Sequence, residues 1–149
     1  MNVQEINAFI FSIEKVFSEN IKLSIKRNNL SPYSPVDISR YSLMINIKVI
    51  SKGIDRIVYY FPELTAKNIS CEMFFGLDIT DKTLIHSAIV ELFYRITTTA
   101  TNFKKDILIN TPPEIKNISK MGDEDKLYGI TIDFSSRFGP FIMSVLDIK

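Results

Sequence analysis

The stretch from Asp81 to Asn102, DKTLIHSAIVELFYRITTTATN, constrains the fold more than any other part of the chain. Its apolar residues recur three and four positions apart, which is the spacing that buries one side of an α-helix. This apolar stripe consists of Leu84, Ile85, Ala88, Ile89, Leu92, Phe93, Ile96 and Ala100. The sequence therefore predicts one long central helix against which the other elements pack.

The other side of this predicted helix carries a polar stripe. Its members are Ser87, Glu91, Tyr94 and Thr98. Their spacing places them on one helix face, which we expect to be exposed because the apolar stripe is buried. These four side chains are the candidate binding face. A purely structural interpretation is also open, in which Glu91 and Arg95 form a surface ion pair worth only about 0.3–0.5 kcal/mol and Tyr94 packs under a loop.

The composition is that of an ordinary globular protein, with 149 residues of which 46% are hydrophobic and 23% charged. This length favours a single domain over residues 1–149 with a sizeable core. The net charge of +1 argues against nucleic acid as a partner, because proteins that bind it usually carry a clear basic excess.

Targeting and metal-site signals narrow the class further. No apolar run approaches the ~20 residues of a membrane span, and the first residues lack the pattern of a signal peptide. Cys71 is the only cysteine, so we expect a reduced, cytoplasmic protein with no membrane partner. His86 is the only histidine and lacks partners for a metal site or a catalytic triad.

The chain before the central helix divides into helical and β patterns. Apolar residues at helical spacing predict a first helix from Asn2 to Asn20, and alternation predicts a strand at Ile21–Ile25. Prolines and polar residues predict a loop over Asn28–Tyr41. Alternating residues in Leu43–Val49, followed by β-branched and aromatic residues in Ile54–Phe61, predict a hairpin.

The rest of the chain adds one helix and further strands. A short helix from Pro62 to Gly76 precedes the central helix. The elements predicted after Asn102 are a strand at Ile107–Ile109 that ends at Thr111-Pro112-Pro113, a charged loop over Lys116–Lys126, and strands at Leu127–Phe134 and Phe141–Ile148. The predicted class is α+β, with helices packed on a largely antiparallel sheet.

This order of elements resembles the CheX branch of the CheC/CheX/FliY family of chemotaxis phosphatases. The residues that carry the resemblance are Asp81, Ser87-Ala88-Ile89, Glu91 and Thr111-Pro112-Pro113. It implies a CheC/CheX-like fold over the single domain. It also implies a partner, the phosphorylated receiver domain of a CheY-like response regulator.

The family signature is an acidic residue or Ser, then Glu four residues later and Asn three residues after that. In the family, the Asn amide orients the water that attacks the aspartyl phosphate, and the Glu pairs with a lysine of the regulator. Transferred to this chain, the resemblance gives Glu91 and Tyr94 as catalytic positions and Ser87, Glu91, Tyr94 and Thr98 as the partner-binding face. It implies no cofactor of the chain's own, because the regulator supplies the magnesium ion.

The chain departs from the signature at Tyr94, which stands at the Asn position. A phenol is longer than Asn and lacks the amide's separate donor and acceptor, so it would fill the space of the attacking water. Thr97–Thr99 stands where the family has a small, Gly-containing segment. The resemblance, with this departure, therefore implies docking of a receiver domain with the phosphatase activity weak or lost.

Two alternatives stay open at this point. In the first, the chain is an active phosphatase in which Tyr94, or a loop residue such as Asn117, replaces the missing amide. In the second, it is a purely structural homodimer, because exposed strands at a sheet edge can pair between copies, as they do in CheX relatives.

Overall fold

The computed structural model describes residues 3–34, 38–51, 53–109, 112–116 and 127–148. Within these ranges the chain forms three α-helices, one short 3-10 helix and a seven-stranded sheet. In chain order the elements are α1 (Val3–Ile21), β1 (Lys26–Pro32), η1 (Ile38–Arg40), β2 (Leu43–Ile50), β3 (Arg56–Phe61), α2 (Glu63–Met73), α3 (Lys82–Phe103), β4 (Leu108–Ile109), β5 (Glu114–Lys116), β6 (Leu127–Ser135) and β7 (Phe141–Ile148).

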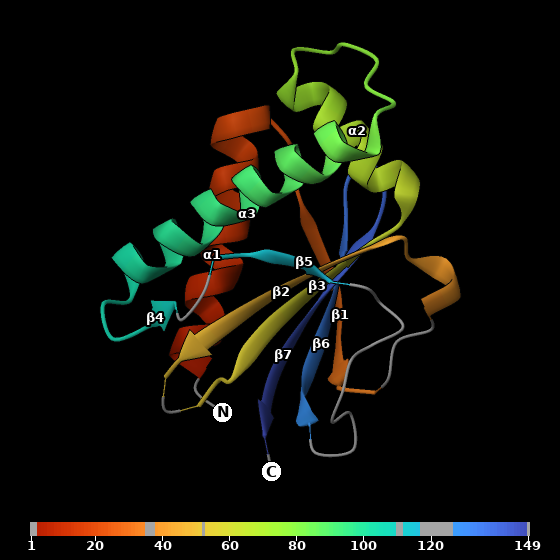
Figure 1. Cartoon of the computed structure of the whole chain (residues 1–149). Coiled ribbons are helices and arrows are strands. Elements are labelled where there is room, and N and C mark those ends of the chain that lie inside the picture. Colours follow the sequence, from red (N-terminus) through yellow and green to blue (C-terminus); the bar gives the residue numbers. More distant parts are fainter. Residues whose placement is uncertain (1–2, 35–37, 52, 110–111, 117–126, 149) are drawn as a thin grey trace.

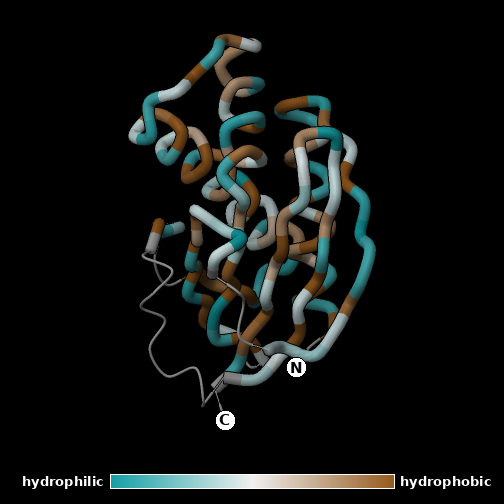
Figure 2. The backbone as a smooth tube through the Cα atoms, turned by 90° about the vertical axis from the view of Figure 1, so that its right-hand side faces the viewer, coloured by the Kyte–Doolittle hydropathy of each residue, from teal (hydrophilic) through white to brown (hydrophobic). Residues whose placement is uncertain are grey.

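The sheet is antiparallel at every strand pair, with the strand order β1-β6-β7-β3-β2-β4, and β5 also pairs with β2. The three helices gather on one face of the sheet (Figure 1). Hydrophobic and hydrophilic residues alternate along much of the backbone (Figure 2), whereas the central strand β3 is buried on both faces. The predicted α+β class, with helices on an antiparallel sheet, is confirmed.

A cluster of aromatic rings holds α3 on the sheet. The ring of Phe93 lies 4.3 Å from that of Tyr59, 5.5 Å from Phe61 and 6.3 Å from Phe17 of α1, measured between ring centroids. Phe141 of β7 stacks on both Phe17 and Phe61. Since Phe93 is fully buried in the middle of α3, this cluster fixes which side of the helix faces outward.

The strand predicted at Ile21–Ile25 is wrong. Ile21 is the last residue of α1, and β1 begins only at Lys26. Lys22 has a left-handed backbone with φ of 50°, and the backbone N–H of Leu23 donates to the carbonyl oxygen of Phe17. The chain therefore turns back at the helix end, with Ile21 and Leu23 buried on either side of Lys22. This order of buried and exposed residues is the same as in a strand, which explains the wrong prediction.

The loop predicted over Asn28–Tyr41 is wrong in its first part, because β1 extends to Pro32 and pairs with β6. All seven residues of β1 are exposed. An edge strand that buries no side chain lacks the apolar alternation by which strands are recognised, and Pro32 is tolerated at an edge.

The other predicted elements are present, with shifted bounds. The hairpin corresponds to β2 and β3, the short helix to α2, and the last two strands to β6 and β7. Of the predicted loop at Lys116–Lys126, Lys116 belongs to β5, and residues 117–126 lie outside the described residues, as do Asn2 and Thr111. Over the ranges given above, no helix has the length and apolarity needed to cross a bilayer.

Candidate functional site

Helix α3 runs from Lys82 to Phe103, within one residue of its predicted bounds. Asp81 caps its start, because one carboxylate oxygen accepts hydrogen bonds from the backbone N–H groups of Thr83 (2.8 Å) and Leu84 (3.3 Å). The buried residues are Ile85, Ala88, Ile89, Leu92, Phe93, Ile96, Thr97 and Ala100. The predicted stripe is thus wrong at Leu84, which lies in the first turn and is 44% exposed, and it lacks Thr97, which is buried.

The four residues of the predicted polar stripe lie together on the exposed side of α3. Ser87, Glu91, Tyr94 and Thr98 are all exposed. The Tyr94 side chain, the largest of them, is 54% exposed. We refer to these four residues as the polar face of α3.

Glu91 is already paired within this face. Its Oε1 atom lies 3.2 Å from Nε of Arg95, one turn further along α3. Nη1 of Arg95 also donates to the Oδ1 atom of Asn20, near the end of α1. The guanidinium thus connects the polar face to α1. An incoming lysine would compete with Arg95 for the Glu91 carboxylate, at little cost because such exposed pairs are weak.

The three threonines at positions 97–99 use their hydroxyls within the helix. Thr97 and Thr98 donate to the Tyr94 carbonyl oxygen at 2.8 and 3.0 Å, and Thr99 donates to that of Arg95 at 2.9 Å. These bonds satisfy the hydroxyl protons while α3 stays continuous to Phe103. The Thr98 hydroxyl can therefore offer a partner its lone pairs, but its proton is already used.

Tyr94 stands at the rim of a hollow of about 370 Å³. The other lining residues are Thr97, Thr98, Thr101, Ile107, Leu108, Ile109, Pro112 and Pro113. The prolines predicted to end a strand thus lie next to Tyr94 and Thr98 of the polar face. Two interpretations of Tyr94 were made from sequence, an exposed binding residue and a packing residue under a loop. Both apply in part, since Tyr94 borders this hollow and is also more than half exposed.

No protein-family model matches this chain, and no curated protein sequence matches it. Solved structures do match it over nearly its whole length. A CheC-like superfamily protein from Shewanella sp. PV-4 superposes with a TM-score of 0.79 at 19% identity, covering 98% of both chains. The chemotaxis protein CheX from Desulfovibrio desulfuricans gives 0.74 at 15% identity, covering 99% of this chain and 100% of the other.

This chain has the CheC/CheX fold. A third match is the CheX–CheY–BeF3–Mg2+ complex from Borrelia burgdorferi, with a TM-score of 0.68 at 15% identity and 99% coverage of both chains. The CheX-like fold predicted from the order of elements and from the long central helix is therefore confirmed.

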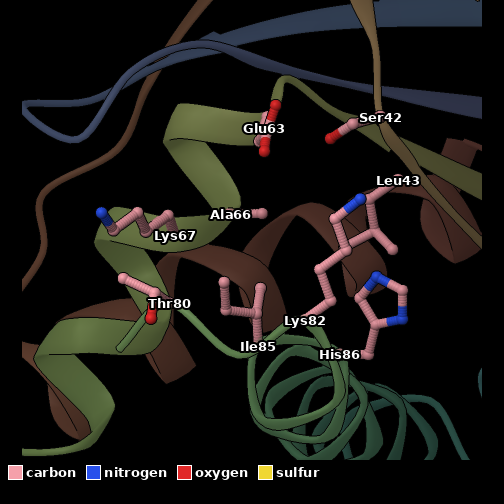
Figure 3. A pocket seen from close by; sticks show the side chains of 9 residues that line it. All are labelled: Ser42, Leu43, Glu63, Ala66, Lys67, Thr80, Lys82, Ile85 and His86. Atoms are coloured by element: carbon pink, nitrogen blue, oxygen red, sulfur yellow. The ribbon is translucent and has the colours of Figure 1, made fainter. Parts of the chain in front are cut away.

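A second hollow, of about 340 Å³, lies at the start of α3 in this CheC/CheX fold. It is lined by Ser42, Leu43, Glu63, Ala66, Lys67, Thr80, Lys82, Ile85 and His86 (Figure 3). Lys67 pairs with Asp78 at 3.4 Å, whereas His86 turns to this hollow and away from the polar face. Over the described residues, no three His, Cys, Asp or Glu side chains are placed to hold a metal ion.

A third hollow, of about 610 Å³, borders Arg95 on the side of α1. It is lined by Asn20, Ile21, Lys22, Glu72, Met73, Phe75, Gly76 and Arg95. This region was not predicted from sequence, because it combines the ends of α1 and α2 with the middle of α3. The one local signal was the apolar pair Phe74-Phe75 directly before Gly76, where a helix end normally turns polar.

Proposed function

We propose that this chain docks the receiver domain of a CheY-like response regulator through the polar face of α3, and that its phosphoaspartate phosphatase activity is weak or lost. The observation that carries the proposal is an exposed Glu91 on the long helix of a CheC/CheX fold, with Tyr94 exposed three residues later. The solved complex of a CheX with CheY, whose CheX has this fold, supports the choice of partner.

Docking is argued from Glu91. The carboxylate is exposed and lies at the middle of α3, where a partner can approach it without displacing a loop of the described chain. Its ion pair with Arg95 is exposed and therefore weak, so that a charged partner can compete for the carboxylate at little cost. A lysine of the receiver domain would exchange with Arg95 or share the carboxylate with it.

Loss of catalysis is argued from Tyr94. Hydrolysis of an aspartyl phosphate needs a water held in line with the leaving oxygen, and positioning is most of what a protein can contribute to this chemistry. The phenol at position 94 is half exposed, and the match to the family signature assigns it to the position from which an amide would hold that water. The chain needs no metal of its own in this account, because the receiver domain would bring the magnesium ion.

An active phosphatase remains the second candidate. The exposed Glu91 favours it, since half of the family's catalytic pair is retained in an accessible position. Asn117, the loop residue considered as a replacement for the missing amide, lies outside the described residues.

A structural homodimer through the sheet edge stays a prediction. At the β1 edge, Lys26, Arg27 and Pro32 are residues that discourage strand pairing between copies.

The docking proposal is tested by titrating the receiver domain, activated with beryllofluoride and Mg2+, into wild-type protein and into Glu91→Lys. We expect charge reversal to weaken binding at least about tenfold, because a central charged contact becomes repulsive. The control is Glu63→Lys, the same change at an exposed residue in the first turn of α2 and away from the polar face. Equal affinity of wild type and Glu91→Lys would exclude docking through this face.

A further inference from the structure

The loop that leaves α2 places a phenylalanine in a backbone conformation that normally belongs to glycine. The backbone N–H of Gly76 donates to Cys71 O at 2.8 Å, and that of Phe75 donates to Glu72 O at 3.1 Å. These two bonds form the Schellman motif that ends many helices, in which the residue after the helix cap is left-handed and usually Gly. Here that residue is Phe75, with φ of 59°.

Phe75 is also the most exposed large apolar residue of the described chain, at 98%. A left-handed backbone is unfavourable for a residue with a Cβ atom, and full exposure leaves the ring without packing partners. Gly at this position would avoid both costs. Phe75 therefore adds no packing contact that would stabilise α2 or the rest of the fold.

The surroundings of Phe75 connect it to the polar face of α3. Phe75 and Met73 line the hollow of about 610 Å³, and Arg95 lines the same hollow while its Nε atom pairs with Glu91. Leu77, two residues further along the loop, is 63% exposed. The α2–α3 loop stands away from the sheet at the top of the molecule (Figure 1), and the Arg95 side chain is 48% exposed.

We propose that Phe75 and this hollow are the apolar half of the surface that docks the receiver domain. The inference rests on the docking function proposed above and extends it by a second contact region. Arg95 is the shared element, because it borders the hollow and holds Glu91 on the polar face. Aromatic residues, methionine and arginine are the types enriched in protein interfaces, and Phe75, Met73 and Arg95 line this one hollow.

The test uses Phe75→Gly, in which stability and binding move in opposite directions. Glycine suits the left-handed position, so we expect the midpoint of chemical unfolding to stay unchanged or rise. Affinity for the beryllofluoride-activated receiver domain should fall at least about tenfold, because the apolar contact is lost. The control is Leu64→Ala, an apolar residue of α2 that is 66% exposed but does not line the hollow, and it should leave the affinity unchanged.

The outcomes separate this inference from the docking proposal. If Glu91→Lys abolishes binding while Phe75→Gly binds like wild type, the receiver docks on the polar face and the inference about Phe75 is overturned. If the wild-type protein binds no receiver domain, both the docking proposal and the inference about Phe75 are overturned. A change of oligomeric state in Phe75→Gly, measured by sedimentation, with unchanged receiver affinity would assign Phe75 to self-association and overturn the inference.

Discussion

Glu91 and Arg95 form an ion pair across one turn of α3, and Arg95 extends the contact to Asn20 of α1. The two side chains are 56% and 48% exposed, so the pair contributes little to folding. Its consequence is positional, because one guanidinium contacts the carboxylate on the polar face and also lines the hollow that Phe75 borders.

Replacing Arg95 with Met tests this positional interpretation. We expect the free energy of unfolding to fall by less than about 1 kcal/mol, because exposed ion pairs are weak. Urea denaturation measures the change, and Arg27→Met, which removes an exposed partner of Glu14 at 3.6 Å, is the control. A loss above about 3 kcal/mol, the range found when buried pairs are broken, would mean that Arg95 holds α1 and α3 together instead.

Substitution of Tyr94 by Asn introduces the amide that the proposed function finds missing at this position. We expect the decay of the phosphorylated receiver domain to accelerate at least about tenfold over wild type, because positioning of a nucleophile supplies much of the rate in such reactions. Tyr94→Phe removes the hydroxyl but keeps the ring, so it should produce no gain. If Tyr94→Asn bound the receiver but did not accelerate its dephosphorylation, Tyr94 would not be the cause of the weak activity. The next segment to test would then be Thr97–Thr99.

Gly139 packs against α2 more closely than a side chain allows. A Cβ atom at this position would overlap Oγ1 of Thr65, which donates to the carbonyl oxygen of Pro140 at 2.9 Å, and φ of Gly139 is +122°. We expect Gly139→Ala to lower the free energy of unfolding by about 2 kcal/mol or more, through backbone strain and overpacking.

Gly76→Ala is the matched control for this substitution. Gly76 is also left-handed, with φ of +82°, but a Cβ atom there meets open space. Its cost should stay near the ~1–2 kcal/mol of backbone strain alone. Equal losses in the two variants, measured by thermal and urea unfolding, would show that the contact with Thr65 contributes nothing.

The parts of the fold that bury a regular stripe could be predicted from the sequence. In α3, the spacing of Ile85, Ile89 and Phe93 identified both the buried side and, by exclusion, the exposed position of Glu91. β2 and β3 could likewise be predicted, β2 from its alternating residues and β3 from its run of β-branched and aromatic residues, which is buried almost throughout.

The parts that were missed depend on contacts between distant segments. β1 buries no side chain, so nothing in Lys26–Pro32 distinguishes it from a loop until β6 is placed beside it. The hollow near Phe75 forms where the ends of α1 and α2 lie close to Arg95 of α3. The periodicity of a single helix contains no information about this proximity. Phe75 itself was hidden because Gly76, next to it, explained the helix end equally well.

The measurement that tests the account most directly is the decay of the phosphorylated receiver domain from the same organism, with and without an equimolar amount of this protein. In parallel, binding is measured with the activated and the unmodified receiver. We expect binding that depends on activation and is weakened at least about tenfold by Glu91→Lys, with a decay rate close to that of the receiver alone. Decay accelerated a hundredfold by the wild-type protein would contradict it, because an active phosphatase would then persist despite Tyr94.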